Sequence, residues 1–291
     1  MSAPSAAPIA SARQAYWDWR VALNFILGGS GAGVLIYAAF AFDLGGRLLE
    51  LLGAALIAGG LLGVWSEIGR PWRAMNAFRH ASTSWMSREM FVAPLVLAGA
   101  LAAALLESRG WRWLAAGLAV LYVYTQGRML NGGRGIPAWR EPRTVPLMMA
   151  SGLTEGAGFG VLAGGLLVPL GLQRSPALIL AVVLLARIIA FSSYRRALRR
   201  TGAPSRVLRD LAKFGRVFGI LDVLALAFAI VSVIIAGLSP LILAAALIAV
   251  AAGWWLKYTL VIRLSYKQPF TVPMPVVRGG QPARSGPRPG G

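Results

Sequence analysis

The feature that most constrains the fold of this chain is a succession of apolar runs, each long enough to cross a bilayer. The 291 residues are 57% hydrophobic and only 13% charged, whereas soluble domains carry about a quarter charged residues. A membrane-spanning helix needs about 20 apolar residues, and most of the sequence divides into runs of that length. We therefore predict an all-α integral membrane protein.

Short polar segments divide the apolar sequence into eight predicted transmembrane helices. These spans are expected at residues 21–42, 48–66, 90–106, 113–130, 146–172, 176–194, 217–237 and 241–261. The predicted organisation is a mobile N-terminal tail, a membrane domain made of two four-helix bundles, and an extended Pro/Gly-rich C-terminal tail. These parts are expected at residues 1–16, 17–262 (bundles 17–130 and 146–262) and 263–291.

The basic residues predict the orientation of the chain in the membrane. An even number of spans places both termini on one side, and most of the 29 Lys and Arg residues fall in the tails and loops of that side. By the positive-inside rule both termini are cytoplasmic. The net charge of +19 does not indicate nucleic-acid binding, because the basic residues are dispersed between apolar runs.

The residue types that are missing limit the redox chemistry of the chain. The sequence has no Cys, and its single histidine, His80, lies between two predicted spans, where it is most simply a solvated loop residue. The chain alone therefore holds no iron–sulfur cluster, no c-type haem and no bis-histidine haem. If it takes part in electron transfer, it depends on a partner or on an organic ligand. We predict no metal ligands.

The connection between the second and third spans carries a carboxylate at each end, Glu67 and Glu89. Carboxylates at a membrane are costly and usually have a function or a partner, and ion pairing with arginines of the loop is the competing interpretation. Antiparallel neighbouring spans bring the two acids close together. Oxidation of a quinol releases two protons, which a carboxylate of raised pKa is suited to accept. We predict that both acids exchange protons at a quinone site, with Arg70 and Trp85 beside the head group.

Four further residues lie at the same predicted membrane edge. Asn24 and Gly28 are near the start of the first span, where Gly28 opens the small-residue cluster GGSGAG, and Tyr124 and Arg128 end the fourth span. We predict that all four contact the quinone. Close helix packing is the alternative for the glycines, and an interfacial aromatic belt is the alternative for the tyrosine.

Three charged residues are taken as intramembrane charges of the second half, Glu155, Arg187 and Asp222. Lys257, near the end of the last predicted span, is instead counted with the basic residues of the terminal side. We favour a structural ion pair between Arg187 and one of the acids over a proton path. These charges would also suit a proton-coupled secondary transporter. In a third alternative, a purely structural membrane anchor, Glu67 and Glu89 form ion pairs only.

Several motifs, in this order, resemble a known family. The segments WDWRVALNFILGGSGAG, EIGRPWRAM, TSWMSREMF and GIPAWREP resemble the membrane anchor subunits of molybdopterin oxidoreductases, the family of the DMSO reductase anchor. EIGRP, GIPAWREP and the C-terminal PVVRGG look most like the membrane subunits of phenylacetyl-CoA:acceptor oxidoreductases and of sulfite-oxidising complexes. The resemblance implies a subunit of a prokaryotic inner-membrane complex that binds menaquinone or ubiquinone and no haem.

The resemblance also implies partners and residue roles. A ferredoxin-like iron–sulfur subunit would connect the chain to a molybdopterin subunit containing molybdenum or tungsten, and both would lie on the cytoplasmic face. Glu89 matches a glutamate associated with quinol binding, Tyr124 matches a tyrosine near the quinone, and Glu67 stands where the family has a histidine. Contacts to the iron–sulfur subunit are expected from the C-terminal tail and from Arg73, Arg79, Arg134 and Arg140.

Overall fold

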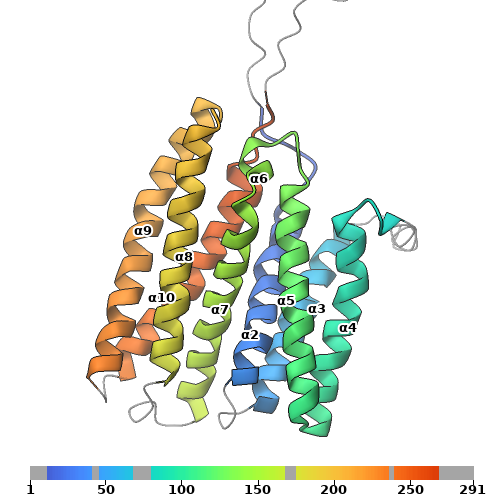
Figure 1. Ribbon diagram of the computed structural model, residues 1–291, viewed down its shortest axis with the longest axis vertical. Coiled ribbons are helices and arrows are strands. Elements are labelled where there is room, and N and C mark those ends of the chain that lie inside the picture. The colour runs from blue at the N-terminus through green and yellow to red at the C-terminus, as the bar shows by residue number, and fades with distance from the viewer. Residues whose placement is uncertain (1–11, 41–45, 68–79, 168–174, 236–238, 269–291) are drawn as a thin grey trace, which may run out of the picture.

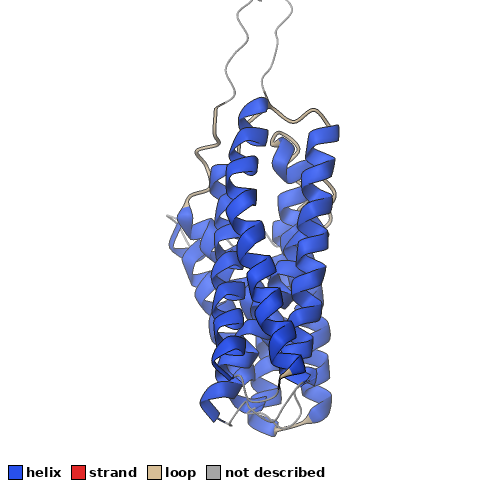
Figure 2. Cartoon of the chain, turned by 90° about the vertical axis from the view of Figure 1, so that its left-hand side faces the viewer, coloured by secondary structure: helices blue, strands red, loops and turns tan. Residues whose placement is uncertain are grey.

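The computed structural model describes residues 12–40, 46–67, 80–167, 175–235 and 239–268. In this part of the chain all regular elements are helices, apart from one isolated β-bridge between Arg13 and Tyr266. The long helices run side by side along one direction and form an elongated bundle (Figures 1 and 2). The all-α prediction is therefore confirmed for the described residues.

The first half of the bundle begins with a continuous helical path from Trp19 to Phe40. The path consists of α1 (Trp19–Leu23), a π-helical turn η1 (Asn24–Gly28) and α2 (Gly29–Phe40). The next three helices are α3 (Gly46–Glu67), α4 (Trp85–Leu106) and α5 (Arg109–Asn131). Helix α2 contacts α3, α5 and α7, so it lies at the centre of the molecule.

The described residues of the second half form one short helix, four long helices and a second π-helical turn. They are α6 (Pro137–Arg140), α7 (Thr144–Leu167), α8 (Ser175–Arg200), α9 (Ser205–Ile234), α10 (Ser239–Tyr258) and η4 (Thr259–Arg263). The segment 195–216, expected as a loop, is instead mostly helical. Its basic residues are good helix formers, and the buried Val207, Leu211 and Phe214 recur at the spacing of one helix face.

In the described part of the chain, seven helical segments are long and apolar enough to cross a membrane. They comprise the Trp19–Phe40 path, α3, α4, α7, α8, α9 and α10 together with η4. Leu62, Leu105 and Ile220 are more than half exposed on the outside of the bundle, and an apolar exterior of this kind requires a nonpolar surrounding. The protein is therefore a multi-pass membrane protein. The remaining predicted span corresponds to α5, whose hydropathy is lowered by the polar groups of its last three turns.

The small-residue cluster of the first span brings α2 close to its neighbours. A β-carbon on Gly31 would meet the backbone of Gly53 in α3, and one on Gly33 would overlap the backbone of Gly152 in α7. Gly156 of α7 is equally close to Gly33. Close approach of helices through small residues is typical of membrane bundles, so helix packing explains Gly31 and Gly33.

The two ends of the described chain meet at one end of the bundle, which we call the terminal end (Figure 1). The Gln14 backbone N–H donates to the Ser265 carbonyl at 2.9 Å, and the Lys267 N–H donates to the Ala12 carbonyl at 2.9 Å. Helix α6 also lies there, because the Trp139 indole donates to the Leu260 carbonyl at 2.8 Å. The start of α4 and the end of α5 lie at this end too (Figure 1).

Candidate functional site

Glu89 lies in the second turn of α4, and its side chain is buried in the bundle. The Ser84 side chain caps the N-terminus of this helix and so fixes where the turn begins. The Asn24 Nδ2 atom donates to Glu89 Oε1 at 3.1 Å, and Gln126 Nε2 donates to the same oxygen at 3.3 Å. Glu89 is therefore held by neutral amides from two other helical segments.

Tyr122 and Gln126 are one turn apart on α5, and both are fully buried. The Tyr122 hydroxyl donates to Asn24 Oδ1 at 3.4 Å, and Gln126 Nε2 also lies 3.1 Å from the Asn24 carbonyl oxygen. Asn24 begins the π-helical turn η1, and such turns occur frequently at functional sites. We call Asn24, Glu89, Tyr122 and Gln126 the Glu89 cluster.

Gly28 and Gly60 leave room for this cluster. A β-carbon on Gly28 would stand 2.7 Å from both the Tyr122 hydroxyl and Gln126 Nε2. A β-carbon on Gly60 would stand 3.2 Å from Asn24 Oδ1. The residue predicted from sequence to contact a ligand, Gly28, therefore lies against the polar side chains that hold Glu89.

An aromatic and cationic group lies one helical turn from Glu89. The Trp85 ring meets the Tyr124 ring edge to face, with centroids 5.8 Å apart. The guanidinium carbons of Arg88 and Arg128 lie 4.1 and 4.8 Å from the Trp85 ring centroid. Arg128 Nε is buried and has no hydrogen-bond partner among the described residues. The structure thus brings together the predicted residues Trp85, Tyr124 and Arg128.

Glu67 ends α3 and lies beside the N-terminal segment. Its charged neighbours are Asp18 and Arg20, and the Arg20 side chain donates to the Ser66 carbonyl at 3.2 Å. Asp18 caps α1, and a hydrogen bond from Arg20 lowers the pKa of its carboxyl group. Glu67 and Glu89 therefore belong to different side-chain groups. Arg70, Arg73 and Arg79 lie outside the described residues, so their roles stay predictions.

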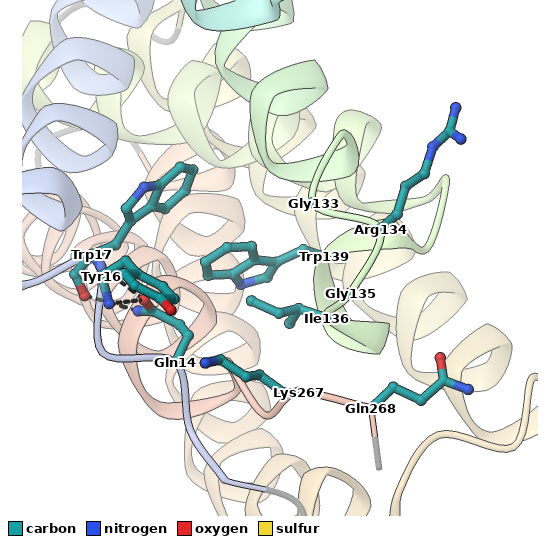
Figure 3. Close-up of a pocket in the computed structure, with 10 residues that line it drawn as sticks. All are labelled: Gln14, Tyr16, Trp17, Gly133, Arg134, Gly135, Ile136, Trp139, Lys267 and Gln268. Carbon is teal, nitrogen blue, oxygen red and sulfur yellow. Dashed lines mark hydrogen bonds between the residues drawn. The ribbon is translucent and has the colours of Figure 1, made fainter. Parts of the chain in front are cut away.

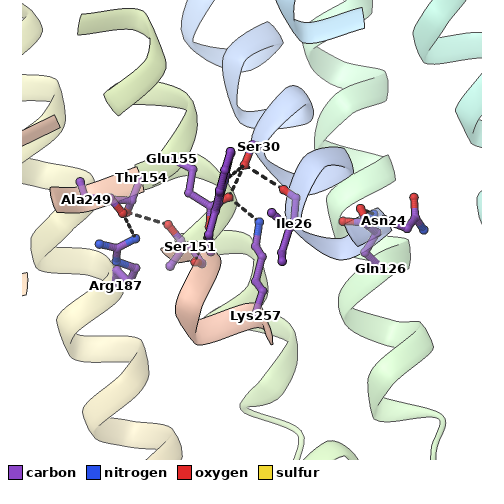
Figure 4. A network of polar contacts seen from close by, with 12 residues as sticks. Asn24, Ile26, Ser30, Gln126, Ser151, Thr154, Glu155, Arg187, Ala249 and Lys257 are labelled. Carbon is purple, nitrogen blue, oxygen red and sulfur yellow. Dashed lines mark hydrogen bonds and ion pairs between the residues drawn. The ribbon is translucent and has the colours of Figure 1, made fainter. Parts of the chain in front are cut away.

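A second buried polar group surrounds Glu155 of α7 (Figure 4). Lys257 Nζ lies 2.6 Å from Glu155 Oε2, and the Ser151 hydroxyl donates to Glu155 Oε1 at 2.8 Å. The Ser30 hydroxyl also donates to Glu155, and the Trp254 indole donates to Ser30 at 2.9 Å. We call Ser30, Ser151, Glu155 and Lys257 the Glu155 cluster.

Arg187 and Asp222 form a fully buried ion pair between α8 and α9. Arg187 Nη2 lies 2.6 Å from Asp222 Oδ1, and Arg187 Nε donates to Asp222 Oδ2 at 3.1 Å. The sequence predicted that Arg187 pairs with an acid, but it assigned Lys257 to the basic terminal side rather than to Glu155. A signal was available, because two intramembrane acids and one arginine leave one acid without a counter-charge.

At two glycines, polar atoms from neighbouring groups approach the space that a side chain would fill. Gln126 Oε1 and Lys257 Nζ both lie within 3.3 Å of the point where a β-carbon on Gly29 would stand. Glu155 Oε1 and Arg187 Nη1 both lie within 2.7 Å of the corresponding point at Gly253.

A row of polar side chains therefore crosses the bundle at these glycine gaps, and Figure 4 shows its part from Asn24 and Gln126 to Arg187. Gln126 Oε1 is buried and accepts no hydrogen bond from any described residue, although buried acceptors normally have a donor. The Glu89 cluster therefore has an unused acceptor on the side that faces the Glu155 cluster.

The terminal end has a cavity of about 700 Å³ (Figure 3). Trp17 and Trp139 form its apolar side and stack with ring centroids 4.8 Å apart. Arg134, at its edge, extends away from the other lining residues (Figure 3), whereas Arg140 donates to Gln268 Oε1 at 2.6 Å. These two arginines, predicted to contact a partner subunit, are therefore at the same end as Glu89.

Neither a metal site nor a known relative identifies the chain. The described residues contain no group of three or more His, Cys, Asp or Glu side chains that could hold a metal ion. No family model matches the sequence, and no curated protein matches it at a significant level. The function is therefore inferred from the side chains and their arrangement.

Proposed function

We propose that this chain is the quinone-reacting membrane anchor subunit of a molybdopterin-dependent oxidoreductase complex. One observation carries the proposal: of the buried acids in the described part of the chain, Glu89 is the one without an ion pair. The others are paired as Glu50–Arg112, Glu141–Arg143, Glu155–Lys257 and Asp222–Arg187.

The partners of Glu89 suit a carboxyl group that gains and loses a proton. Burial disfavours the charged form of a carboxyl group, and donated hydrogen bonds favour it. Asn24 and Gln126 supply such bonds without adding a compensating positive charge. Glu89 can therefore accept a proton at one step and release it at the next, which is the role of a general base and acid.

The neighbouring residues fit a quinone head group. A quinol supplies two electrons together with two protons. Glu89 offers an acceptor for a hydroxyl proton, and the buried Arg128 Nε is a donor that no described residue uses. Trp85 offers a flat aromatic surface beside them, held by the Arg88 and Arg128 guanidinium groups. We assign head-group contacts to Trp85, Tyr124 and Arg128, and proton exchange to Glu89.

We further propose eight spans with both termini in the cytoplasm. Helix α5 would be the eighth span, because it is 23 residues long and packs against α4, α2 and α7. The described ends of the chain are joined at the terminal end, and the adjoining ends of α8 and α9 are rich in arginine. The positive-inside rule therefore favours a cytoplasmic terminal end in a prokaryotic inner membrane.

The terminal end is also where a partner subunit would exchange electrons with the quinone. It carries the 700 Å³ cavity, the outward-pointing Arg134 and the starting turns of α4 with Glu89. An iron–sulfur subunit docked here would lie on the side of the membrane nearest Glu89. The motif resemblance supports the same arrangement, with a molybdenum or tungsten subunit beyond the iron–sulfur subunit.

The test of assembly is purification of the chain from its native membrane in mild detergent. We expect a cysteine-rich ferredoxin-like subunit, a molybdenum- or tungsten-containing subunit and extractable quinone, identified by mass spectrometry and metal analysis. Purification of a homo-oligomer without a redox partner would contradict the anchor function.

The test of the site is Glu89→Gln in the assembled complex. General acid–base groups typically contribute at least about 100-fold to rate, so quinone-dependent turnover should fall by about that factor. Turnover with an artificial acceptor at the iron–sulfur subunit, and the subunit composition, should not change. Glu107→Gln is a matched control, because the Glu107 side chain is exposed. Full quinone-dependent turnover in Glu89→Gln would refute the role of Glu89.

A proton-coupled secondary transporter is the second candidate, and the buried charges of the second half favour it. Glu155, Lys257, Arg187 and Asp222 are all fully buried, and such residues often mark proton or substrate paths. In proteoliposomes without any redox partner, a substrate gradient would drive proton movement through a transporter and change the internal pH. Glu155→Gln would abolish that signal, whereas an anchor subunit would produce none.

A further inference from the structure

A separate polar cavity of about 530 Å³ lies between α9 and α10 near the terminal end. Three cationic side chains line it, Arg13, Lys213 and Arg263, together with one acid, Asp210. None of these residues belongs to the Glu89 cluster or to the Glu155 cluster. The cavity is therefore a distinct feature of the second half of the bundle.

The charge of this cavity is positive. Asp210 interacts with Arg13 at 3.3 Å and accepts a hydrogen bond from the Tyr266 hydroxyl at 2.8 Å. The charge of Asp210 is thus offset by Arg13. Lys213 and Arg263 form no ion pair with any described residue. Two cations therefore remain available for an anion.

Thr259 points to a ligand independently of the charges. It lines the cavity and is only 1% exposed, yet its hydroxyl has no hydrogen-bond partner among the described residues. In contrast, the other five threonines of the described chain all donate to a backbone carbonyl. A buried hydroxyl without a partner is costly.

This hydroxyl lies where the helix changes its hydrogen-bond pattern. Thr259 is the first residue of the π-helical turn η4. A helical threonine usually bonds a carbonyl of the preceding turn, whereas a π-helical turn shifts the hydrogen-bond register and is frequent at functional sites. The Thr259 hydroxyl can therefore donate to a bound group.

An apolar wall continues from the charged part of the cavity. Phe214 and Trp255 line it and meet edge to face with ring centroids 4.7 Å apart. Val217, the next lining residue along α9, is nearly half exposed at 48% on the surface of the bundle. The cavity therefore combines cations, a hydroxyl donor and an apolar wall that reaches the surface.

We propose that this cavity binds the phosphate group of an anionic phospholipid. Lys213, Arg263 and the Thr259 hydroxyl hold the phosphate, because charge-assisted hydrogen bonds to phosphate are the strong ones. An acyl chain lies along Trp255 and Val217. Inorganic phosphate or a soluble phosphate ester has the same charged group, but it leaves the apolar wall without a partner.

The experiment measures lipid binding to the purified, delipidated protein by native mass spectrometry. Phosphatidylglycerol is compared with phosphatidylcholine, and glycerol 3-phosphate is the soluble probe. Thr259→Val removes the hydroxyl, and Thr259→Ser keeps it, so the two variants form a matched pair. Removing the hydroxyl breaks no hydrogen bond within the described protein. Lys213→Gln is matched by Arg209→Gln, an exposed residue one turn earlier on the same helix.

We expect the unmodified protein and the Thr259→Ser and Arg209→Gln variants to prefer phosphatidylglycerol. Thr259→Val and Lys213→Gln should each weaken its binding about tenfold, the effect of losing one hydrogen bond to a charged group. Equal binding of both lipids, or unchanged binding by both cavity variants, would overturn the proposal. Glycerol 3-phosphate binding as tightly as phosphatidylglycerol would overturn the lipid assignment.

Discussion

The Glu89 cluster and the Glu155 cluster are buried in the same bundle, but their carboxyl groups have different partners. Glu89 is held by the neutral amides of Asn24 and Gln126. Glu155 is paired with Lys257, and the neighbouring Asp222 is paired with Arg187. Protonation of Glu155 or Asp222 would leave a buried cation without its anion. Protonation of Glu89 would leave no cation unpaired.

The two halves should therefore respond differently to substitution. Removing one member of a buried ion pair strands a charge, which costs about 3–5 kcal/mol. Replacing a carboxyl group that is held by amides strands no charge. We expect variants of the second half to lose stability, and variants of the Glu89 cluster to lose function with little loss of stability.

The largest effect is expected for Arg187→Met. Asp222 would remain fully buried without its cation, so the free energy of unfolding should fall by about 3–5 kcal/mol. Thermal unfolding in detergent measures this loss. The double variant Arg187→Met/Asp222→Leu should recover most of it, because neither charge remains. A double variant that is no more stable than Arg187→Met would show that the pair has another role.

Lys257→Met should have a smaller effect than Arg187→Met. Glu155 would lose its cation but would keep the hydrogen bonds from Ser30 and Ser151, which partly stabilise the anion. We expect a loss of about 2–3 kcal/mol, measured in the same unfolding experiment. Adding Glu155→Gln should restore stability. A loss larger than that of Arg187→Met would reverse the proposed ranking of the two pairs.

Gly28→Ala tests the space around the Glu89 cluster. The added methyl group would press on the ends of Tyr122 and Gln126, which can shift, so we expect a loss of about 1–2 kcal/mol. The displaced Gln126 should also lower quinone-dependent turnover. Gly117→Ala on α5 is the control, because its β-carbon would meet nothing within 4 Å. Equal turnover in both variants would show that Gln126 does not position Glu89.

The sequence predicted the helical class and most of the long helices, because an apolar run of about 20 residues crosses a bilayer as an α-helix, which satisfies all its backbone hydrogen bonds internally. It also placed Asn24 at the depth of Glu89, and the structure joins them by a hydrogen bond. It missed Tyr122 and Gln126 as partners of Glu89. The reason is that helices that are apolar on every side do not indicate from their sequence which face meets which neighbour.

In the second half, too, the sequence did not show which charged residues are buried or helical. Lys257 follows an apolar run directly, so it resembled a basic residue at the membrane surface, and only packing against α7 shows that it is buried. Residues 195–216 resembled a loop because of their charge, although their apolar residues repeat at helical spacing. In both cases local charge was a weaker guide than the helix face on which the residue lies.

The smallest change in stability is expected for Glu89→Gln, the variant that most directly tests the contrast between the two clusters. Glutamine keeps the shape and the acceptor oxygen that Asn24 and Gln126 contact, so the free energy of unfolding should change by less than about 1 kcal/mol. Glu155→Gln, made in parallel, leaves the fully buried Lys257 without its anion and should cost more. If both variants lost the same stability, Glu89 would also be charge-paired in the folded protein. A stable Glu89→Gln protein without quinone-dependent turnover would instead separate proton exchange from structural support.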